Sequence, residues 1–231
     1  MMTKMFESQL GKNVEVYIDD MVVKSKLVSE HLADLSNIFE ILRWHKLRLN
    51  ASKCSFGVGS GRFLGYMVTH WGIEVNPYQI RVINSLQPSR NPNEVQKLTG
   101  MMSALSRFIS RLVERCRPFF LLLHKWKEFR WSEECVIAFQ ELKRYLSHPL
   151  IMFSLMVDEV LFAYITVALH AISLVLIQVN NGIQRPVYYV SKSLNEVEVR
   201  YLPLEKAILA VVHATRKLPH YFQAHTVVVL T

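Results

Sequence analysis

Two adjacent carboxylates, Asp19 and Asp20, are the side chains of this sequence that most clearly could do chemistry. They separate two short apolar runs, residues 14–18 and 21–23, and this pattern predicts a β-hairpin with both acids at its tip. Adjacent carboxylates repel each other unless a cation joins them. Their oxygens suit Mg²⁺, and two such ions support phosphoryl transfer. The alternative is an ordinary tight turn, where aspartate is common because it bonds its own backbone.

The elements around this hairpin predict a compact α/β layer. Residues 29–45 carry apolar side chains at helical spacing, and Ser29 could cap this helix. Residues 46–49 and 63–68 have the composition of strands, with a glycine-rich turn between them. We therefore expect one side of the helix to pack on a sheet that carries the two carboxylates.

A second unit is expected from about residue 76, where prolines predict breaks between helices. Its strongest helix is predicted at residues 93–115. One face of that helix carries polar, small and cationic side chains three or four residues apart: Gln96, Gly100, Ala104, Arg107 and Arg111. Small residues would let a duplex approach the helix backbone, and arginines would donate to its phosphates. The alternative is that the glycine and alanine pack on a neighbouring helix.

The positive charge of the chain is concentrated in one stretch. The 231 residues are 51% apolar and carry a net charge of +8, yet residues 81–130 alone hold ten Lys and Arg against three acids. A localised cationic region is typical of a protein that binds a polyanion, most simply nucleic acid. The alternative is a solvated helical face that only aids solubility.

The last third of the chain predicts a helix followed by a sheet. Residues 132–147 form an amphipathic pattern that Ser132 could cap. A three-stranded meander is expected from three β-rich runs: residues 161–167, 173–177 and 186–190. A helix at residues 204–218 contains Glu205, and a further strand is expected from residue 226, so we expect this last domain to be incomplete.

Composition also bears on the compartment. No run of 18 apolar residues and no signal-peptide pattern occurs, so we expect a soluble intracellular protein without a membrane partner, in the cytoplasm or the nucleus. The three cysteines are widely spaced and form no metal-ligand pattern, which favours reduced packing residues: Cys54, Cys116 and Cys135.

Six motifs, taken in order, resemble the polymerase region of gypsy-like long-terminal-repeat retrotransposons of plants. They are VYIDD at 16–20, LNASKC at 49–54, FLGY at 63–66, VQKLTG at 95–100, FRWS at 129–132 and PVYYVSK at 186–192. The resemblance implies an α/β (α+β) fold with a partial polymerase palm, a helical thumb, a connection and a truncated ribonuclease H-like domain. The implied boundaries are 1–75 for the palm, 76–130 for the thumb, 131–155 for the connection and 156–231 for the last domain.

The same resemblance implies roles for individual residues. Asp19 and Asp20 would hold catalytic Mg²⁺, with Tyr17 near the primer. Lys53 would contact the phosphates of an incoming deoxynucleotide, although it could equally be an ordinary surface lysine. The hairpin that grips the primer terminus would comprise Phe63, Leu64, Gly65 and Tyr66. Gln96, Gly100 and Ala104 would follow the minor groove of a DNA duplex or an RNA/DNA hybrid.

Departures from the family pattern restrict the expected activity. The polymerase needs a third carboxylate from an earlier strand. Glu15 is the nearest acid before Asp19, but about 13 Å separates the two along an extended strand, so Glu15 cannot complete the site. In the ribonuclease H part, Thr166 occupies the position of the first aspartate, and the last aspartate would follow Thr231. Glu205 alone remains as a catalytic and metal-binding acid. Residues 158 and 159, both acidic, are expected in a solvent-exposed turn.

The sequence therefore predicts a fragment of a retrotransposon Pol polyprotein whose ancestral activities were RNA-directed DNA polymerisation and hybrid cleavage. We expect no polymerase activity from this chain alone. Two alternatives remain at this point: a non-catalytic nucleic-acid-binding remnant, and a degenerate reading frame that makes no stable protein.

Overall fold

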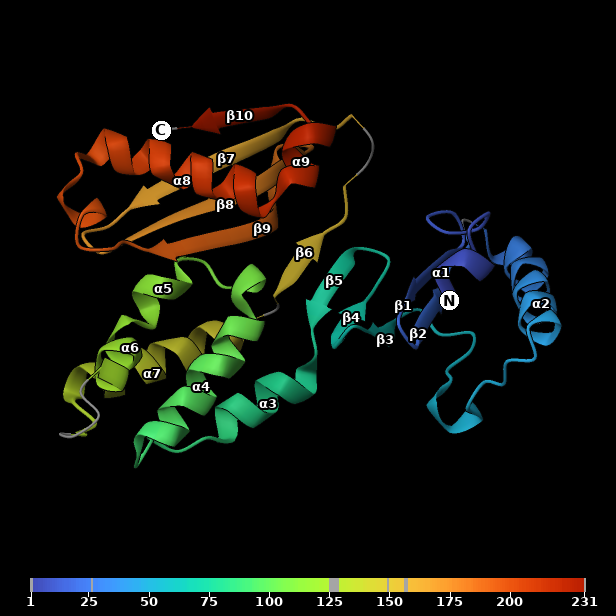
Figure 1. The fold of residues 1–231 in the computed structure, drawn as a ribbon, viewed down its shortest axis with the longest axis horizontal. Helices are drawn as coiled ribbons and strands as arrows, with labels where there is room; N and C mark the ends of the chain where they lie inside the picture. The colour runs from blue at the N-terminus through green and yellow to red at the C-terminus, as the bar shows by residue number, and fades with distance from the viewer. Residues whose placement is uncertain (1, 26, 125–128, 149, 156–157, 231) are drawn as a thin grey trace. The chain divides into compact units, whose positions relative to one another are not determined.

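The computed structural model describes residues 2–25, 27–124, 129–148, 150–155 and 158–230, shown in Figure 1. The chain forms two compact units, Met1–His70 (unit 1) and Trp71–Thr231 (unit 2). Both mix helices and strands, so the predicted α/β class is confirmed. Unit 1 contains α1 (Met2–Met5), β1 (Val14–Tyr17), β2 (Asp20–Val23), α2 (Val28–Trp44), the 3-10 turn η1 (Ala51–Lys53), β3 (Gly61–Phe63) and β4 (Tyr66–Val68).

The core of unit 1 lies between the β1–β2 hairpin and the helices α1 and α2. Its buried side chains come from the residue that follows α1, from β1 and from α2: Phe6, Val14, Ile38 and Leu42. Partly buried side chains of α1 and β2 pack against them. The predicted helix is present, but it begins at Val28 after Leu27, so Ser29 lies inside its first turn and is not its cap. The predicted packing of one side of α2 on the hairpin is confirmed.

The strand predicted at residues 46–49 is wrong. Lys46 leaves α2 with a left-handed backbone (φ 56°), and the Leu47 amide donates to the Leu42 carbonyl at 2.9 Å. This is the hydrogen-bond pattern with which many helices end. Residues 47–50 belong to neither a helix nor a strand.

Residues 63–68 form a hairpin rather than one continuous strand. β3 pairs antiparallel with β4, with Phe63 opposite Tyr66. Leu64 and Gly65 both have positive φ (53° and 81°), as the commonest two-residue hairpin turn requires. The single strand that composition predicted at residues 63–68 is therefore wrong, and only the family resemblance had indicated a hairpin there.

Unit 2 combines a helical part with a four-stranded sheet. The helical part contains β5 (Gly72–Val75), α3 (Pro77–Ser85), α4 (Pro92–Ala104), η2 (Ser106–Phe108), α5 (Leu112–Arg115), α6 (Arg117–His124), α7 (Glu133–Leu146) and β6 (Ile151–Phe153). The sheet part contains β7 (Leu161–Val167), β8 (Ala171–Asn180), β9 (Ile183–Ser193), η4 (Glu198–Arg200), α8 (Pro203–Lys217), α9 (Pro219–Ala224) and β10 (Val227–Leu230).

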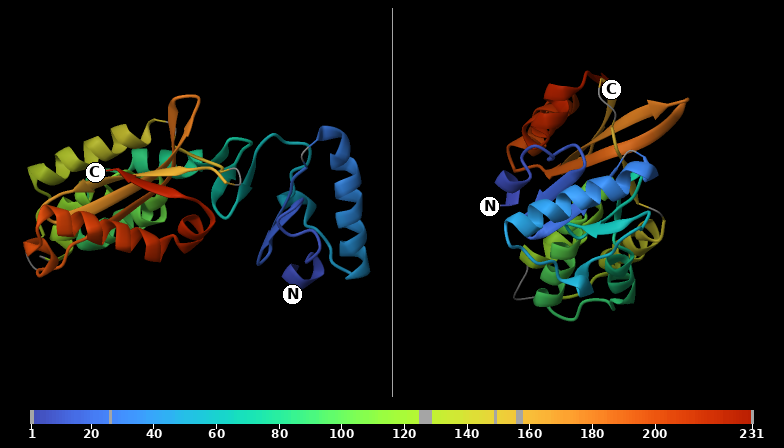
Figure 2. Two further views of the ribbon diagram at one scale, coloured as in Figure 1. Left: turned by 90° about the horizontal axis from the view of Figure 1, so that it is seen from above. Right: turned by 90° about the vertical axis from the view of Figure 1, so that its right-hand side faces the viewer.

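The strand order of this sheet is β10-β7-β8-β9. β7, β8 and β9 form the predicted antiparallel meander, and Asn181 and Gly182 supply the positive φ angles of its second turn. β10 pairs parallel with β7, so the strand predicted from residue 226 is confirmed. α8 lies along one face of the sheet, as Figures 1 and 2 show, and Ala214 and Leu218 pack there against buried residues of β7 and β8.

Side-chain caps explain where three helices of unit 2 begin. Asn76 accepts from the Tyr78 amide at the start of α3, and Asn91 accepts from the Glu94 amide at the start of α4, each at 3.0 Å. The predicted cap of α7 is confirmed, since the Ser132 hydroxyl accepts from the Cys135 amide at 3.4 Å.

The helix predicted at residues 93–115 is broken, because α4 ends at Ala104. The Tyr145 hydroxyl, on α7, donates to the Phe108 carbonyl and accepts from the Ser110 amide, both at 3.1 Å. The Arg115 guanidinium donates to the Ser110 carbonyl at 2.9 Å. These tertiary partners satisfy backbone groups that would otherwise bond along a helix.

Three smaller expectations have clear outcomes. Cys116 and Cys135 are buried free thiols and Cys54 is partly buried, and burial raises the pKa of Cys116 to about 12. Asp158 lies in an exposed turn as predicted, whereas Glu159 is partly buried. Among the described helices, none is long and apolar enough to cross a membrane.

Candidate functional site

The carboxylate pair lies at the tip of the β1–β2 hairpin. Tyr17 pairs with Asp20, so the two turn residues are Ile18 and Asp19, one position earlier than the sequence pattern predicted. Asp19 and Asp20 are both exposed, and Ile18 is 71% exposed with a left-handed backbone (φ 54°). A β-branched residue rarely adopts this conformation, and such strain is found more often at functional sites than elsewhere.

The residues present fit Mg²⁺ only in part. Asp19 and Asp20 offer the hard oxygen ligands that the ion prefers. However, no group of three or more acidic, histidine or cysteine side chains that could hold a metal occurs among the residues that the structure describes. Glu15 is paired instead with Lys24, at 2.8 Å between Oε1 and Nζ. By themselves, Asp19 and Asp20 do not complete a Mg²⁺ site among the described residues, and their role as metal ligands stays a prediction.

Most of the other predicted residues of unit 1 are exposed, and Phe63 and Tyr66 are partly buried. Tyr17 is 55% exposed beside Asp20, and Lys53 is exposed at the end of η1. Asn50 holds this short turn by accepting from the amide and the hydroxyl of Ser52, at 3.1 and 2.7 Å. The predicted primer hairpin is the turn between β3 and β4 and comprises Phe63, Leu64, Gly65 and Tyr66. Their roles in binding stay predictions.

The exposed face of α4 carries Gln96, Gly100 and Ala104. A Cβ atom built on Gly100 would meet no neighbouring atom within 4 Å in the described part of the chain. Gly100 therefore does not serve to pack α4 on a neighbouring helix, which was the alternative to a binding role. Lys97 is exposed on the same helix, three residues before Gly100, although the predicted set did not include it.

Arg107 and Arg111 do not continue this face, because both follow the end of α4. The Arg107 guanidinium lies 4.7 Å from the centre of the Tyr188 ring on β9, which is the distance of a cation–π contact. Arg111 has a left-handed backbone (φ 52°) and pairs with Glu114, with 2.8 Å between Nε and Oε2. This ion pair lowers the pKa of the Glu114 carboxyl.

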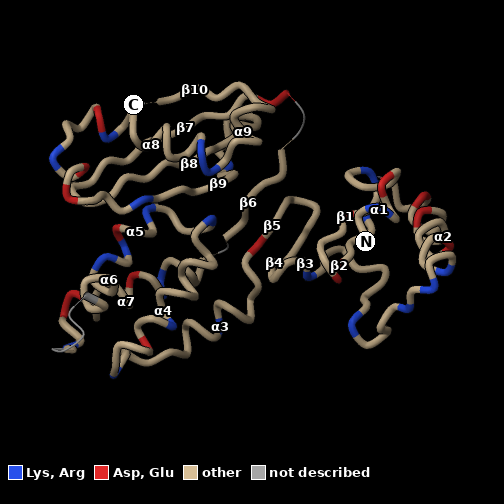
Figure 3. The backbone as a smooth tube through the Cα atoms, in the orientation of Figure 1, with Lys and Arg blue, Asp and Glu red and all other residues tan. Residues whose placement is uncertain are grey.

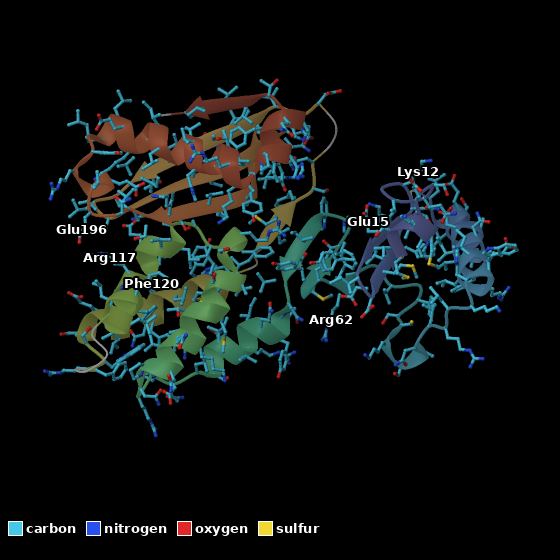
Figure 4. All side chains as sticks on the ribbon, in the orientation of Figure 1. Lys12, Glu15, Arg62, Arg117, Phe120 and Glu196 are labelled. Carbon is cyan, nitrogen blue, oxygen red and sulfur yellow. The ribbon has the colours of Figure 1, made fainter. Side chains whose placement is uncertain are left out.

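The cationic side chains of residues 81–130 thus fall into two groups. Some of its cations take part in packing, such as Arg107 and Arg115, whose guanidinium lies 4.7 Å from the Tyr145 ring centre. Others are exposed, including Arg81, Lys97 and Arg117. Figure 3 shows the cations distributed over the helical part of unit 2, and Figure 4 labels Arg117 on α6. Exposed cations near α4 remain able to attract a polyanion.

In the ribonuclease H-like part, Thr166 and Glu205 lie on separate elements. Thr166 is exposed on β7, opposite Ser173 of β8. Glu205 is in the first turn of α8, where its Oε2 accepts from the Leu202 amide at 2.8 Å. That hydrogen bond satisfies an otherwise unpaired amide at the helix start, so the carboxylate has a structural role that needs no metal.

Glu205→Ala is expected to destabilise unit 2 by about 1 kcal/mol, because the Leu202 amide loses its acceptor. Glu205→Gln keeps an acceptor oxygen and should cost less than half as much. Thermal unfolding with and without Mg²⁺ checks both variants. If Glu205→Gln loses more stability than Glu205→Ala, and only when Mg²⁺ is present, the charge of Glu205 stabilises the fold rather than its hydrogen bond to the Leu202 amide.

Comparison with known proteins identifies two kinds of sequence in the chain. Residues 1–68 match the family "Reverse transcriptase (RNA-dependent DNA polymerase)". Residues 131–229 match the "RNase H-like domain found in reverse transcriptase". The chain corresponds to a fragment of a transposon Pol polyprotein with a reverse transcriptase part and a ribonuclease H-like part.

The individual relatives agree with this class. The Retrovirus-related Pol polyprotein from transposon 297 of Drosophila melanogaster is 31% identical over 222 residues, 95% of this chain and 20% of that protein. The polyprotein from transposon opus of the same organism is 29% identical over 100% of the chain and 24% of its own length. The Tf2-3 polyprotein of Schizosaccharomyces pombe is 23% identical over 92% of this chain and 16% of its own length. The chain spans a quarter or less of each.

Solved structures share the fold. A foamy viral protease-reverse transcriptase in complex with double-stranded DNA aligns with a TM-score of 0.86 at 21% identity, over 99% of this chain and 40% of that one. The same kind of protein in complex with an RNA/DNA hybrid aligns with a TM-score of 0.84 at 21% identity, over 99% and 31%. At this identity the likeness concerns the fold.

Proposed function

We propose that this chain is a segment of a gypsy-like, plant-type Pol polyprotein that holds a nucleic-acid duplex along α4 and does not polymerise DNA by itself. The observation that carries the proposal is the open space beside Gly100 on an exposed helix face. A helix normally avoids glycine, which costs about 1 kcal/mol relative to alanine. A glycine at this position is explained if a duplex approaches the helix backbone closely, because glycine has no side chain to prevent that approach.

The electrostatic setting supports the same partner. Lys97 is exposed on α4, and Arg90 is exposed just before the helix begins. Their cationic groups can neutralise duplex phosphates without reading a sequence. Relatives of this fold have been solved with double-stranded DNA and with an RNA/DNA hybrid, which supports either as the duplex.

Lys97→Glu is expected to weaken binding of a fluorescent duplex about tenfold, the equivalent of about 1.4 kcal/mol, because an attraction becomes a repulsion. The affinity of the unaltered chain should also fall steeply as salt is raised. Fluorescence anisotropy of the complete chain measures both. Arg200→Glu is the matched control, since this exposed cation lies on η4, and it should leave affinity within about twofold. If Lys97→Glu and Arg200→Glu lose the same duplex affinity, the proposal that the duplex binds along α4 is wrong.

Inactivity in polymerisation follows from the incomplete acid set. Asp19 and Asp20 offer two carboxylates, and among the described residues no further acidic, histidine or cysteine side chain joins them in a group of three that could hold a metal ion. A primer-extension assay with Mg²⁺ and deoxynucleotides is expected to give no product. Extension that Asp19→Asn abolishes would contradict the proposal, and the absence of a cooperative thermal transition would favour a chain that does not fold.

A further inference from the structure

The outer face of α8 carries an apolar stripe. Leu204, Ile208 and Val212 are 69%, 56% and 37% exposed, although each is a large aliphatic side chain. They are spaced four residues apart and therefore lie along one side of the helix. The opposite side holds the buried residues Lys206, Ala210 and Ala214, so the stripe faces directly away from the sheet. Contiguous exposed apolar residues of this kind often mark an interaction surface.

Opposite charges flank the two ends of the α8 stripe. Glu205 is exposed near the start of the helix, and Arg216 is exposed near its end. Eleven residues separate them, about three turns or 16 Å, so both lie on the same edge of the stripe. Glu205 uses Oε2 for the Leu202 amide, and a carboxylate retains acceptor capacity at its second oxygen.

We propose that the α8 stripe is a self-association surface, on which a second copy of this chain packs its own α8 in the antiparallel direction. A two-fold axis perpendicular to the helices reverses the direction of α8 and keeps its charged edge on the same side. Glu205 of each copy then faces Arg216 of the other. The apolar side chains meet in the middle, with Ile208 near Val212 of the second copy. A parallel two-fold arrangement would put the two charged edges on opposite sides of the interface, so Glu205 would not meet Arg216 of the second copy.

The expected dimer is weak. A single helix pair buries much less than a standard interface, so a dissociation constant in the micromolar range is expected. Sedimentation velocity of the complete chain from about 1 to 300 µM covers this range. Ile208→Glu should weaken association at least tenfold, because it places a carboxylate in the apolar centre. Ile137→Glu is the matched control: Ile137 is 52% exposed within α7, and its replacement should leave association unchanged.

A charge-exchange experiment tests the antiparallel geometry itself. Arg216→Glu and Glu205→Lys should each weaken self-association, since each places like charges opposite one another at both ends of the helix pair. An equimolar mixture of the two variants should regain association close to that of the unaltered chain, because every pair in the mixed dimer is again of opposite sign. Circular dichroism checks that Glu205→Lys remains folded without its cap.

The outcomes separate the alternatives. A chain that is monomeric at all concentrations overturns the proposal and leaves the stripe to another partner. Dimers that persist in Ile208→Glu place the interface elsewhere and also overturn it. Dimers that Ile208→Glu disrupts, but that the mixed variants do not restore, contradict the antiparallel register. None of these results depends on whether the chain binds a duplex.

Discussion

Phe119→Ala is expected to lower the free energy of unfolding of unit 2 by about 3–5 kcal/mol, the usual cost of removing a fully buried aromatic ring. Phe119, on α6, is fully buried. Its ring stacks on Trp131 with centroids 5.6 Å apart and meets the edge of Phe139, on α7, at 6.5 Å. Trp131 and Phe139 also contact each other at 5.8 Å. The substitution therefore leaves a cavity bordered by two large rigid side chains.

Chemical denaturation followed by circular dichroism measures this effect. Phe120→Ala is the matched control, because this neighbouring residue, labelled in Figure 4, is only partly buried. Its replacement should cost about 1–2 kcal/mol, in proportion to the smaller area buried. If both variants lose the same stability, the three-ring cluster does not organise the helical part as the structure indicates.

Gly100→Leu is expected to act in opposite directions on stability and on binding. Since nothing lies within 4 Å of the added Cβ position, leucine should stabilise α4 by about 1 kcal/mol through its better helix propensity. The same side chain would hold a duplex several ångströms away from the helix backbone. Affinity for a duplex should then fall about a hundredfold, or about 2.7 kcal/mol.

Fluorescence anisotropy and thermal unfolding of the same sample measure the two effects together. Gln140→Leu is the control, since it adds a leucine to an exposed position of α7. It should change neither property by more than about 0.5 kcal/mol. Duplex affinity that survives Gly100→Leu would exclude the exposed face of α4 as the interface, whatever its charge.

The family resemblance to reverse transcriptase and ribonuclease H-like sequences was available from ordered motifs, and the comparisons confirm it. Helices with side-chain caps were also predictable. Ser132 marked the start of α7 correctly, because an N-cap is a local contact between a side chain and a backbone only a few residues away. The division of the chain at residues 75, 130 and 155 stays a prediction.

The errors fall where distant residues decide local structure. The periodicity of residues 93–115 is helical throughout, yet Tyr145 bonds the backbone at Phe108 and Ser110 and stabilises a break. These two hydrogen bonds join residues that are 35 and 37 positions apart, and no local pattern contains either. As a result, Arg107 reaches Tyr188 on the sheet and Arg111 pairs with Glu114, away from the face that both were predicted to share.

By itself, then, the sequence determined the class of the protein, the carboxylate hairpin, the helices α2, α7 and α8 and the β7–β9 meander, because these follow from residue type and local spacing. Only the tertiary structure decided which side chains are exposed to a binding partner and which take part in packing within the fold. It exposes Gly100 on α4, assigns Arg107 to packing, makes Glu205 a helix cap and leaves the α8 stripe uncovered in the described chain. Whether a side chain is exposed depends on contacts between segments that are distant in the sequence, and these contacts form only in the folded chain.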